Sequence, residues 1–145
     1  MPLPFHVSCR QRSVLLFELR DGRFQLLQQG PVAPFMPGFR YLLVEHPLAS
    51  FLSALAIPGL SAVPATLFNR GTGEEYHTHS RLIVGQFFRA EKIQDTPTDG
   101  CRVFTMDDRE YFVSPALKAV LECSEFSYLR FSEGLSEFAF GAKES

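Results

Sequence analysis

Apolar and polar positions follow one another along residues 110–132 in the pattern of a strand, a short helix and a second strand. Residues 111–113 are aromatic or β-branched, which is typical of strands. Ser114 can cap a helix with its hydroxyl, and Pro115 suits the first helical position. Helical spacing then predicts one apolar stripe facing a sheet, made of Leu117, Val120 and Leu121. A helix of about two to three turns is not stable alone, so we expect this unit to pack on further strands.

Two more local patterns predict a second helix and a tight hairpin. The helix begins at Pro47, and Pro58 marks its end. Its apolar stripe recurs at helical spacing and consists of Leu48, Phe51, Leu52 and Leu55. The hairpin turn is the dipeptide Asp21-Gly22, because glycine accepts the positive φ that such turns require. It joins strands expected at residues 13–19 and 23–28.

Further strands are predicted where β-branched and aromatic residues gather between turn residues. They are expected at residues 5–8, 39–45, 62–68 with a break at Pro64, 76–88 and 101–105. Residues 30–38 are rich in proline and glycine, so a loop is expected there. The sequence therefore predicts an α+β fold, with a mostly antiparallel sheet and two short helices packed on one face. We expect a single domain over residues 1–145, with a flexible tail at about 136–145.

Composition removes several classes of function. The chain has 145 residues, of which 46% are hydrophobic and 21% charged, and this is enough to bury one core. The net charge is −2 and the 14 basic residues are scattered, which argues against a nucleic-acid partner. No apolar run approaches the roughly 18 residues of a membrane span, and no signal peptide is recognisable. The three cysteines are far apart and predict no disulfide framework, so we expect a cytoplasmic protein.

The sharpest chemical motif is the pair His77 and His79. Histidines two residues apart on a strand point to the same face and can share one metal ion, because imidazole binds zinc, iron and copper. The segment resembles the first half of the cupin metal motif, but Ile83 and Val84 stand where the cupin glutamate is expected. The remaining histidines, distant in the sequence as third ligands, are His6 and His46.

An alternative interpretation of the same segment needs no chemistry. An antiparallel strand with one solvated face shows alternation of this kind without any function. On this interpretation we expect no metal and no other cofactor. The solvent face would carry His77, His79 and Arg81, and the partly buried face Tyr76, Thr78, Leu82 and Val84.

A partner-binding surface is the other candidate site. Acidic residues fall in predicted turns, and an apolar pair lies between prolines in the loop expected at residues 30–38. An exposed apolar tip beside polar groups commonly marks an interface. The alternative, in which Phe35 folds back on the core, stays open. The candidate partner-binding residues are Phe35, Met36, Glu74, Glu75, Asp107 and Asp108.

Several short features occur in a fixed order between residues 69 and 135. A Thr-Gly-Glu turn at 72–74 leads into a strand, and a later strand ends in Phe-Val-Ser at 112–114. A Leu-Lys pair at 117–118 and a closing Tyr-Leu-Arg-Phe strand at 128–131 follow. In this order the segment resembles bacterial immunity proteins that neutralise polymorphic or contact-delivered toxins, a group catalogued as a domain of unknown function. The family's closing strand runs into a proline that this chain lacks, and residues 1–60 do not align with the family.

The resemblance implies a binding protein without catalytic residues. Such a protein occupies its cognate toxin protein and blocks the active site or holds the toxin inactive, with acidic patches steering association when the toxin is basic. Two other hypotheses stay open. One is a small metal-dependent, cupin-like enzyme that uses His77 and His79, and the other is an adaptor or structural subunit that binds another protein. The sequence sets no oligomeric state.

Overall fold

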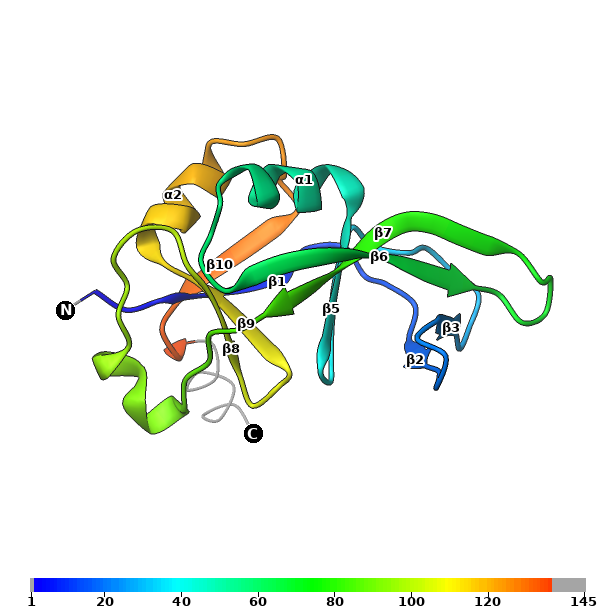
Figure 1. Ribbon diagram of the computed structural model, residues 1–145, viewed down its shortest axis with the longest axis horizontal. Coiled ribbons are helices and arrows are strands. Elements are labelled where there is room, and N and C mark those ends of the chain that lie inside the picture. The colour runs from blue at the N-terminus through cyan, green and yellow to red at the C-terminus, as the bar shows by residue number, and fades with distance from the viewer. Residues whose placement is uncertain (1, 137–145) are drawn as a thin grey trace.

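The computed structural model describes residues 2–136, which form an α+β fold on two β-sheets. Figure 1 shows both helices on the same side of the sheets. The predicted α+β class, with mostly antiparallel strands and two short helices, is confirmed, and the strands divide between a four-stranded and a six-stranded sheet. Of the predicted tail, residues 137–145 lie outside the described residues.

The four-stranded sheet holds the first strand of the chain in its interior. Its order is β10-β1-β9-β8, with all neighbours antiparallel. The strands are β1 (Phe5–Cys9), β8 (Val103–Met106), β9 (Glu110–Val113) and β10 (Leu129–Glu133). The strand, helix and strand predicted at residues 110–132 are confirmed as β9, α2 (Pro115–Glu122) and β10. These two strands do not pair with each other, because β1 lies between them.

The six-stranded sheet has the order β2-β3-β6-β7-β5-β4, in which β3 and β6 pair in parallel and the other neighbours antiparallel. The predicted hairpin turn is confirmed, with Gly22 at φ 89°. β6 runs through Pro64 without the predicted break. β3 reaches β6 at Leu67 and Phe68, beyond the proline, so Pro64 lies at an open edge, as expected for this residue. The strands are β2 (Leu16–Glu18), β3 (Phe24–Leu26), β4 (Phe35–Gly38), β5 (Tyr41–Glu45), β6 (Leu60–Phe68) and β7 (Glu75–Val84).

The largest core cluster lies between the helices and both sheets. The predicted helical stripes point into it, with Leu48 and Leu52 of α1 (His46–Ala54) and Leu117 and Leu121 of α2 buried. A 3-10 helix, η1 (Ala90–Asp95), lies outside the predicted elements, and its Ile93 packs in a separate cluster. The four-stranded sheet contributes Val7, Val113 and Leu129 to the shared core, and the six-stranded sheet Leu42, Val44 and Leu82.

The loop predicted at residues 30–38 ends in a strand. Phe35 and Met36 belong to β4 and are each only 5% exposed. The prediction that they form an exposed apolar tip is therefore wrong, and the alternative, in which Phe35 folds back on the core, is confirmed. Pro37 is tolerated because β4 is an edge strand that pairs with β5 alone.

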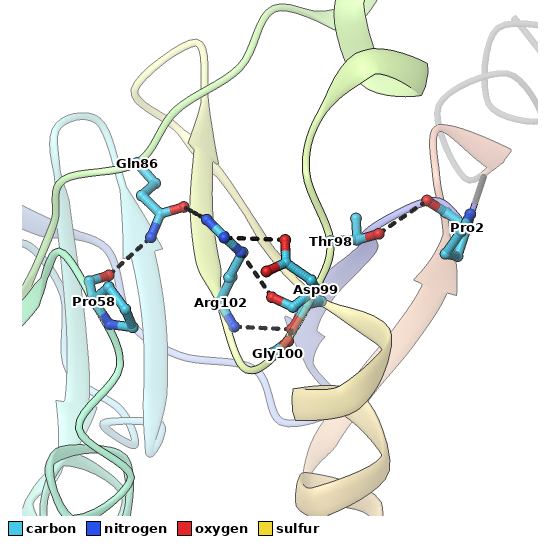
Figure 2. Close-up of polar contacts among 8 residues, drawn as sticks. Pro2, Pro58, Gln86, Thr98, Asp99, Gly100 and Arg102 are labelled. Carbon is cyan, nitrogen blue, oxygen red and sulfur yellow. Dashed lines mark hydrogen bonds and ion pairs between the residues drawn. The ribbon is translucent and has the colours of Figure 1, made fainter.

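A polar network ties the start of β8 to two other segments, as Figure 2 shows. The guanidinium of Arg102 donates to the Asp99 carbonyl and carboxylate at 2.8 and 3.1 Å and to the Gln86 amide oxygen at 3.0 Å. Gln86 in turn donates to the carbonyl of Pro58 at 2.9 Å. Ser114 does not cap α2 as predicted, because its fully buried hydroxyl donates to the Gly100 carbonyl and accepts from the Arg102 backbone N–H. The network therefore holds together segments that are distant in the sequence.

Candidate functional site

A groove of about 700 Å³ brings three of the four histidines together. His46 lies here because β5, which ends next to it, pairs with β7 in the register Glu45↔His79. His46 is therefore close to His77 and His79 although it is distant from them in the sequence. His6 lies elsewhere, beside Glu110 on β9. We call this site the histidine groove. Its lining residues are Gln11, Val32, Pro34, Glu45, His46, Pro47, His77, Thr78, His79 and Tyr128.

A β-bulge gives the two motif histidines different environments. Between the pairs Ala65↔His79 and Leu67↔Tyr76, β7 contains one residue more than β6, so the alternation of side chains shifts. His77 is exposed, but His79 is only 4% exposed. The interpretation that placed both histidines on a solvent face is therefore wrong for His79. Of the face predicted to be partly buried, Leu82 is buried, Tyr76 and Val84 are half-buried, and Thr78 is exposed.

The His79 imidazole is held by two hydrogen bonds. Its Nε2 lies 2.8 Å from the Ala33 carbonyl oxygen, and its Nδ1 lies 2.8 Å from Thr78 Oγ1. A carbonyl only accepts, so Nε2 carries the proton. Burial lowers the pKa of His79 below its ordinary value of 6.5, despite the opposing bond to Ala33. The ring is therefore neutral near pH 7, and Nδ1 accepts the hydroxyl proton of Thr78.

The His46 imidazole is engaged in the same way. Its Nε2 donates to the His77 carbonyl oxygen at 2.6 Å, and its Nδ1 lies 2.9 Å from the buried Ser80 hydroxyl. The carbonyl again places the proton on Nε2. His46 therefore fixes the backbone of β7 at the bulge and has no ring nitrogen left for another partner.

Glu45 and Tyr128 form the third polar pair of the groove. The phenol of Tyr128 donates to Glu45 Oε2 at 2.5 Å. Burial raises the pKa of Tyr128, and the hydrogen bond to Glu45 raises it further. The phenol therefore stays protonated, and Glu45 is the one Asp, Glu, Lys or Arg side chain among the described lining residues.

This geometry does not favour the metal hypothesis. A metal ligand needs an imidazole lone pair, and both nitrogens of His79 and of His46 already take part in hydrogen bonds. The exposed His77 has its Nε2 3.6 Å from Glu75 Oε1. Within residues 2–136, no three His, Cys, Asp or Glu side chains come together in a way that could hold a metal ion.

No family model, curated protein or solved structure matches this chain. None of the helices described in residues 2–136 has the length and apolar character needed to cross a membrane. Any function has therefore to be inferred from the chemistry of the described surface and of the groove.

The acidic candidates fall in two separate turns. Glu74 and Glu75 lie at the tip of the β6–β7 hairpin, where Glu74 accepts from the Tyr76 phenol and Glu75 lies 3.5 Å from Arg23. Asp107 and Asp108 form the β8–β9 turn, which is far from that tip in Figure 1. All four are exposed, but they do not form one acidic patch.

One surface was missed at the sequence level. At the end of the molecule away from the helices, β2, β3, β6 and the start of β7 form a small lobe (Figure 1). Direct cross-strand pairing places Phe17, Gln25, Phe68 and Glu75 in one row on one face. Leu15 and Leu27 flank this row, since the Leu27 N–H donates to the Leu15 carbonyl at 2.9 Å. We call these six residues the lobe face: Leu15, Phe17, Gln25, Leu27, Phe68 and Glu75.

The lobe face is the solvent side of an amphipathic sheet. The alternate residues Phe24, Leu26 and Leu67 are buried in a core cluster on the opposite side. The solvent side of such a sheet is normally polar, yet Leu15, Phe17 and Leu27 are 65%, 58% and 54% exposed. The residue pattern predicted these strands correctly. Both faces of the strands carry apolar residues, and which face is buried depends on contacts with the rest of the chain.

Proposed function

We propose that this protein is an immunity protein, which binds a cognate bacterial toxin in the cytoplasm and neutralises it by direct contact. The observation that carries the proposal is the lobe face, where three large apolar side chains are exposed together at a free edge of the six-stranded sheet. Clusters of this kind on a small domain mark protein interaction sites.

The position of the lobe face supports binding by a preformed surface. β2 is the outermost strand of its sheet, so its backbone edge is open beside Phe17. On the opposite side of the lobe, Phe24 and Leu67 are buried in one cluster with Val14, Met36 and Leu43, which favours a rigid surface. A rigid surface binds with less loss of conformational entropy than one that must first become ordered.

Charge at one end of the lobe face suits a basic toxin. Glu75 is the last of the four cross-strand neighbours on the lobe face, and Glu74 precedes it at the hairpin tip. Arg23 lies 4.4 Å over the ring of Phe68 and reaches Glu75 at 3.5 Å, so the acidic charge is partly balanced. Glu74 and Glu75 are therefore expected to steer association, and the apolar residues to supply affinity.

The proposal predicts that a toxin domain is encoded beside this gene, and the test is direct binding to that domain, produced as a catalytically inactive variant. Size-exclusion chromatography is expected to show a stoichiometric complex, and calorimetry to give its affinity. Phe17→Glu places a charge in the centre of the lobe face and is expected to weaken binding by roughly tenfold or more, as loss of an interface anchor does. Phe87→Glu is the matched control, because Phe87 is 77% exposed and lies on the connection after β7.

Two results would contradict the proposal. The first is the absence of a complex between the unchanged protein and the neighbouring toxin domain. The second is an equal loss of affinity in Phe17→Glu and Phe87→Glu, which would place the interface elsewhere. Both variants change exposed positions, so their melting temperatures are expected to stay close to that of the unchanged protein.

A further inference from the structure

We propose that the histidine groove is a binding site for a guanidinium or ammonium group, with the carboxylate of Glu45 as its counter-charge. The hydrogen-bonding capacity of the groove favours such a group, whether or not the protein binds a toxin. Most hydrogen-bond donors of the groove are used within the protein, several acceptors are not, and its one Asp, Glu, Lys or Arg side chain among the described residues is Glu45.

Four hydrogen-bond donors of the groove are already used within the protein. The Nε2–H groups of His46 and His79 both donate to backbone carbonyls, at 2.6 and 2.8 Å. The hydroxyl proton of Thr78 is given to His79 Nδ1, and that of Tyr128 to Glu45. Of the described lining side chains, Gln11 and the exposed His77 retain a donor for a ligand.

The acceptors remain. A carboxylate has about four lone-pair sites, and among the described residues Tyr128 is the one side chain that bonds the Glu45 carboxylate. The hydroxyl oxygens of Tyr128 and Thr78 each keep lone pairs after donating their protons. The groove therefore presents oxygen acceptors from three side chains and complements a ligand rich in N–H donors.

Charge and shape select the same class of ligand. No lysine or arginine is present among the described lining residues, and the neutral His79 adds no positive charge. A guanidinium offers five N–H donors and an ammonium three, without any acceptor. Val32, Pro34 and Pro47 form apolar walls, against which the aliphatic stem of an arginine or lysine side chain packs well. A groove of about 700 Å³ has room for such a side chain.

The first experiment titrates the isotope-labelled protein with Nα-acetylarginine methylamide and follows its backbone amides by NMR. Saturable shifts are expected at the amides of Glu45, His46 and residues 77–79, with weak affinity because the carboxylate of Glu45 is only half-buried. The citrulline analogue has the same shape but no charge, and no saturable shift is expected with it. Agmatine distinguishes the two sources of such a group: tighter binding of agmatine indicates a free small cation, and tighter binding of the blocked arginine indicates a protein side chain.

Variants then test whether the carboxylate of Glu45 is the counter-charge of the bound cation. Glu45→Gln keeps an acceptor for Tyr128 and removes the charge, so the affinity for the arginine probe is expected to fall roughly threefold or more. Glu74→Gln is the matched control, because Glu74 also accepts from a tyrosine, Tyr76, at 2.8 Å but lies outside the groove. Tyr128→Phe removes one neutral acceptor but keeps the carboxylate, so it is expected to weaken binding less than Glu45→Gln does.

The proposal is overturned if the arginine probe causes no saturable shift in the groove, or if citrulline binds equally well. It also fails if Glu45→Gln and Glu74→Gln weaken binding to the same extent. The NMR spectrum of each variant shows in the same experiment whether it is folded, so loss of structure cannot be mistaken for loss of the site.

Discussion

The three histidines of the groove differ in what their neighbours allow them to do. His46 and His79 each give one proton to a backbone carbonyl, so His46 links α1 to β7, and His79 links β7 to the segment before β4. His77 is exposed, and the Nε2 of its ring lies 3.6 Å from Glu75. The environment of each imidazole, more than the spacing of the motif, decides its chemistry.

Protonation of His79 is expected to destabilise the protein. Burial lowers the pKa of His79 from its ordinary 6.5, so between the folded-state pKa and about 6.5 the unfolded chain binds more protons than the folded protein. The stability that neutral His79 contributes is fully present above about pH 6.5 and is lost as the pH falls through the folded-state pKa. Melting temperatures measured from about pH 7.5 to about pH 5 are therefore expected to fall.

Two variants isolate this effect. His79→Gln does not titrate and can still donate to Ala33, so its melting temperature is expected to depend less on pH. His77→Gln is the control, because its ring is exposed, and it is expected to keep the original dependence. If the melting temperature depends equally on pH in all three proteins, the assignment to His79 is wrong.

The Ser114 hydroxyl is a second side chain whose role depends on its partners. It is fully buried and bonds the Arg102 N–H at 2.9 Å and the Gly100 carbonyl at 2.7 Å. Ser114→Ala leaves both groups unpaired and is expected to lower the free energy of unfolding by about 1–3 kcal/mol in urea titrations. Ser50→Ala, at an exposed position of α1, is expected to stay within about 0.5 kcal/mol. A similar small effect of both variants would show that water or a rearranged loop replaces the bonds.

At the scale of elements, the backbone conformation of the β8–β9 turn explains why Asp107 and Asp108 are there, and no binding partner is needed to account for them. Asp107 and Asp108 have φ values of 57° and 56°, and the Arg109 N–H bonds the Met106 carbonyl at 3.3 Å. Two successive positive φ values are those of a type I′ hairpin turn, which favours asparagine and glycine. Aspartate tolerates this backbone better than most residues, which accounts for its presence here.

Glycine at the second turn position is expected to stabilise the protein. Asp108→Gly removes the cost of a positive φ, which exceeds the extra conformational entropy of glycine, and is expected to raise the free energy of unfolding by about 0.5–1 kcal/mol. The ion pair that it removes, 3.6 Å from Arg40, is exposed and contributes little. Asp108→Asn removes the charge but keeps a side chain, so it separates the two effects in the same urea titration. The conformational explanation is contradicted if the free energy of unfolding is lower for Asp108→Gly than for Asp108→Asn.

Local elements could be predicted from the sequence, but the contacts between them could not. The Asp21-Gly22 turn and both helical stripes depend on neighbours within a few residues, and these were correct. The burial of His79 depends on a bulge opposite β6 and on the carbonyl of Ala33, 46 residues away. Phe35 was misplaced for the same kind of reason, since a proline-rich segment can form a strand when it lies at the edge of a sheet.

At the scale of the whole molecule, one core joins the two sheets. Leu117 is fully buried in the cluster that also contains Val7 of the four-stranded sheet and Leu82 of the six-stranded sheet. The sheets are therefore expected to unfold together. Amide resonances of β7 and β9 followed in urea are expected to show one common transition.

Leu117→Ala tests this coupling. The cavity left behind is expected to lower the free energy of unfolding by about 2–5 kcal/mol and to shift the transitions of both sheets equally. Leu15→Ala, at an exposed position of the lobe face, is expected to stay within about 0.5 kcal/mol. A shift confined to the four-stranded sheet would show two independently folding units.

The interior position of β1 also has a consequence for biosynthesis. β1 pairs with β9 on one side and with β10 on the other, so an interval separates the synthesis of β1 from that of both its partner strands. At cellular rates of translation, this interval is roughly ten seconds. The four-stranded sheet can therefore be completed only once Glu133 has been added to the nascent chain, and until then β1 lacks part of its cross-strand pairing.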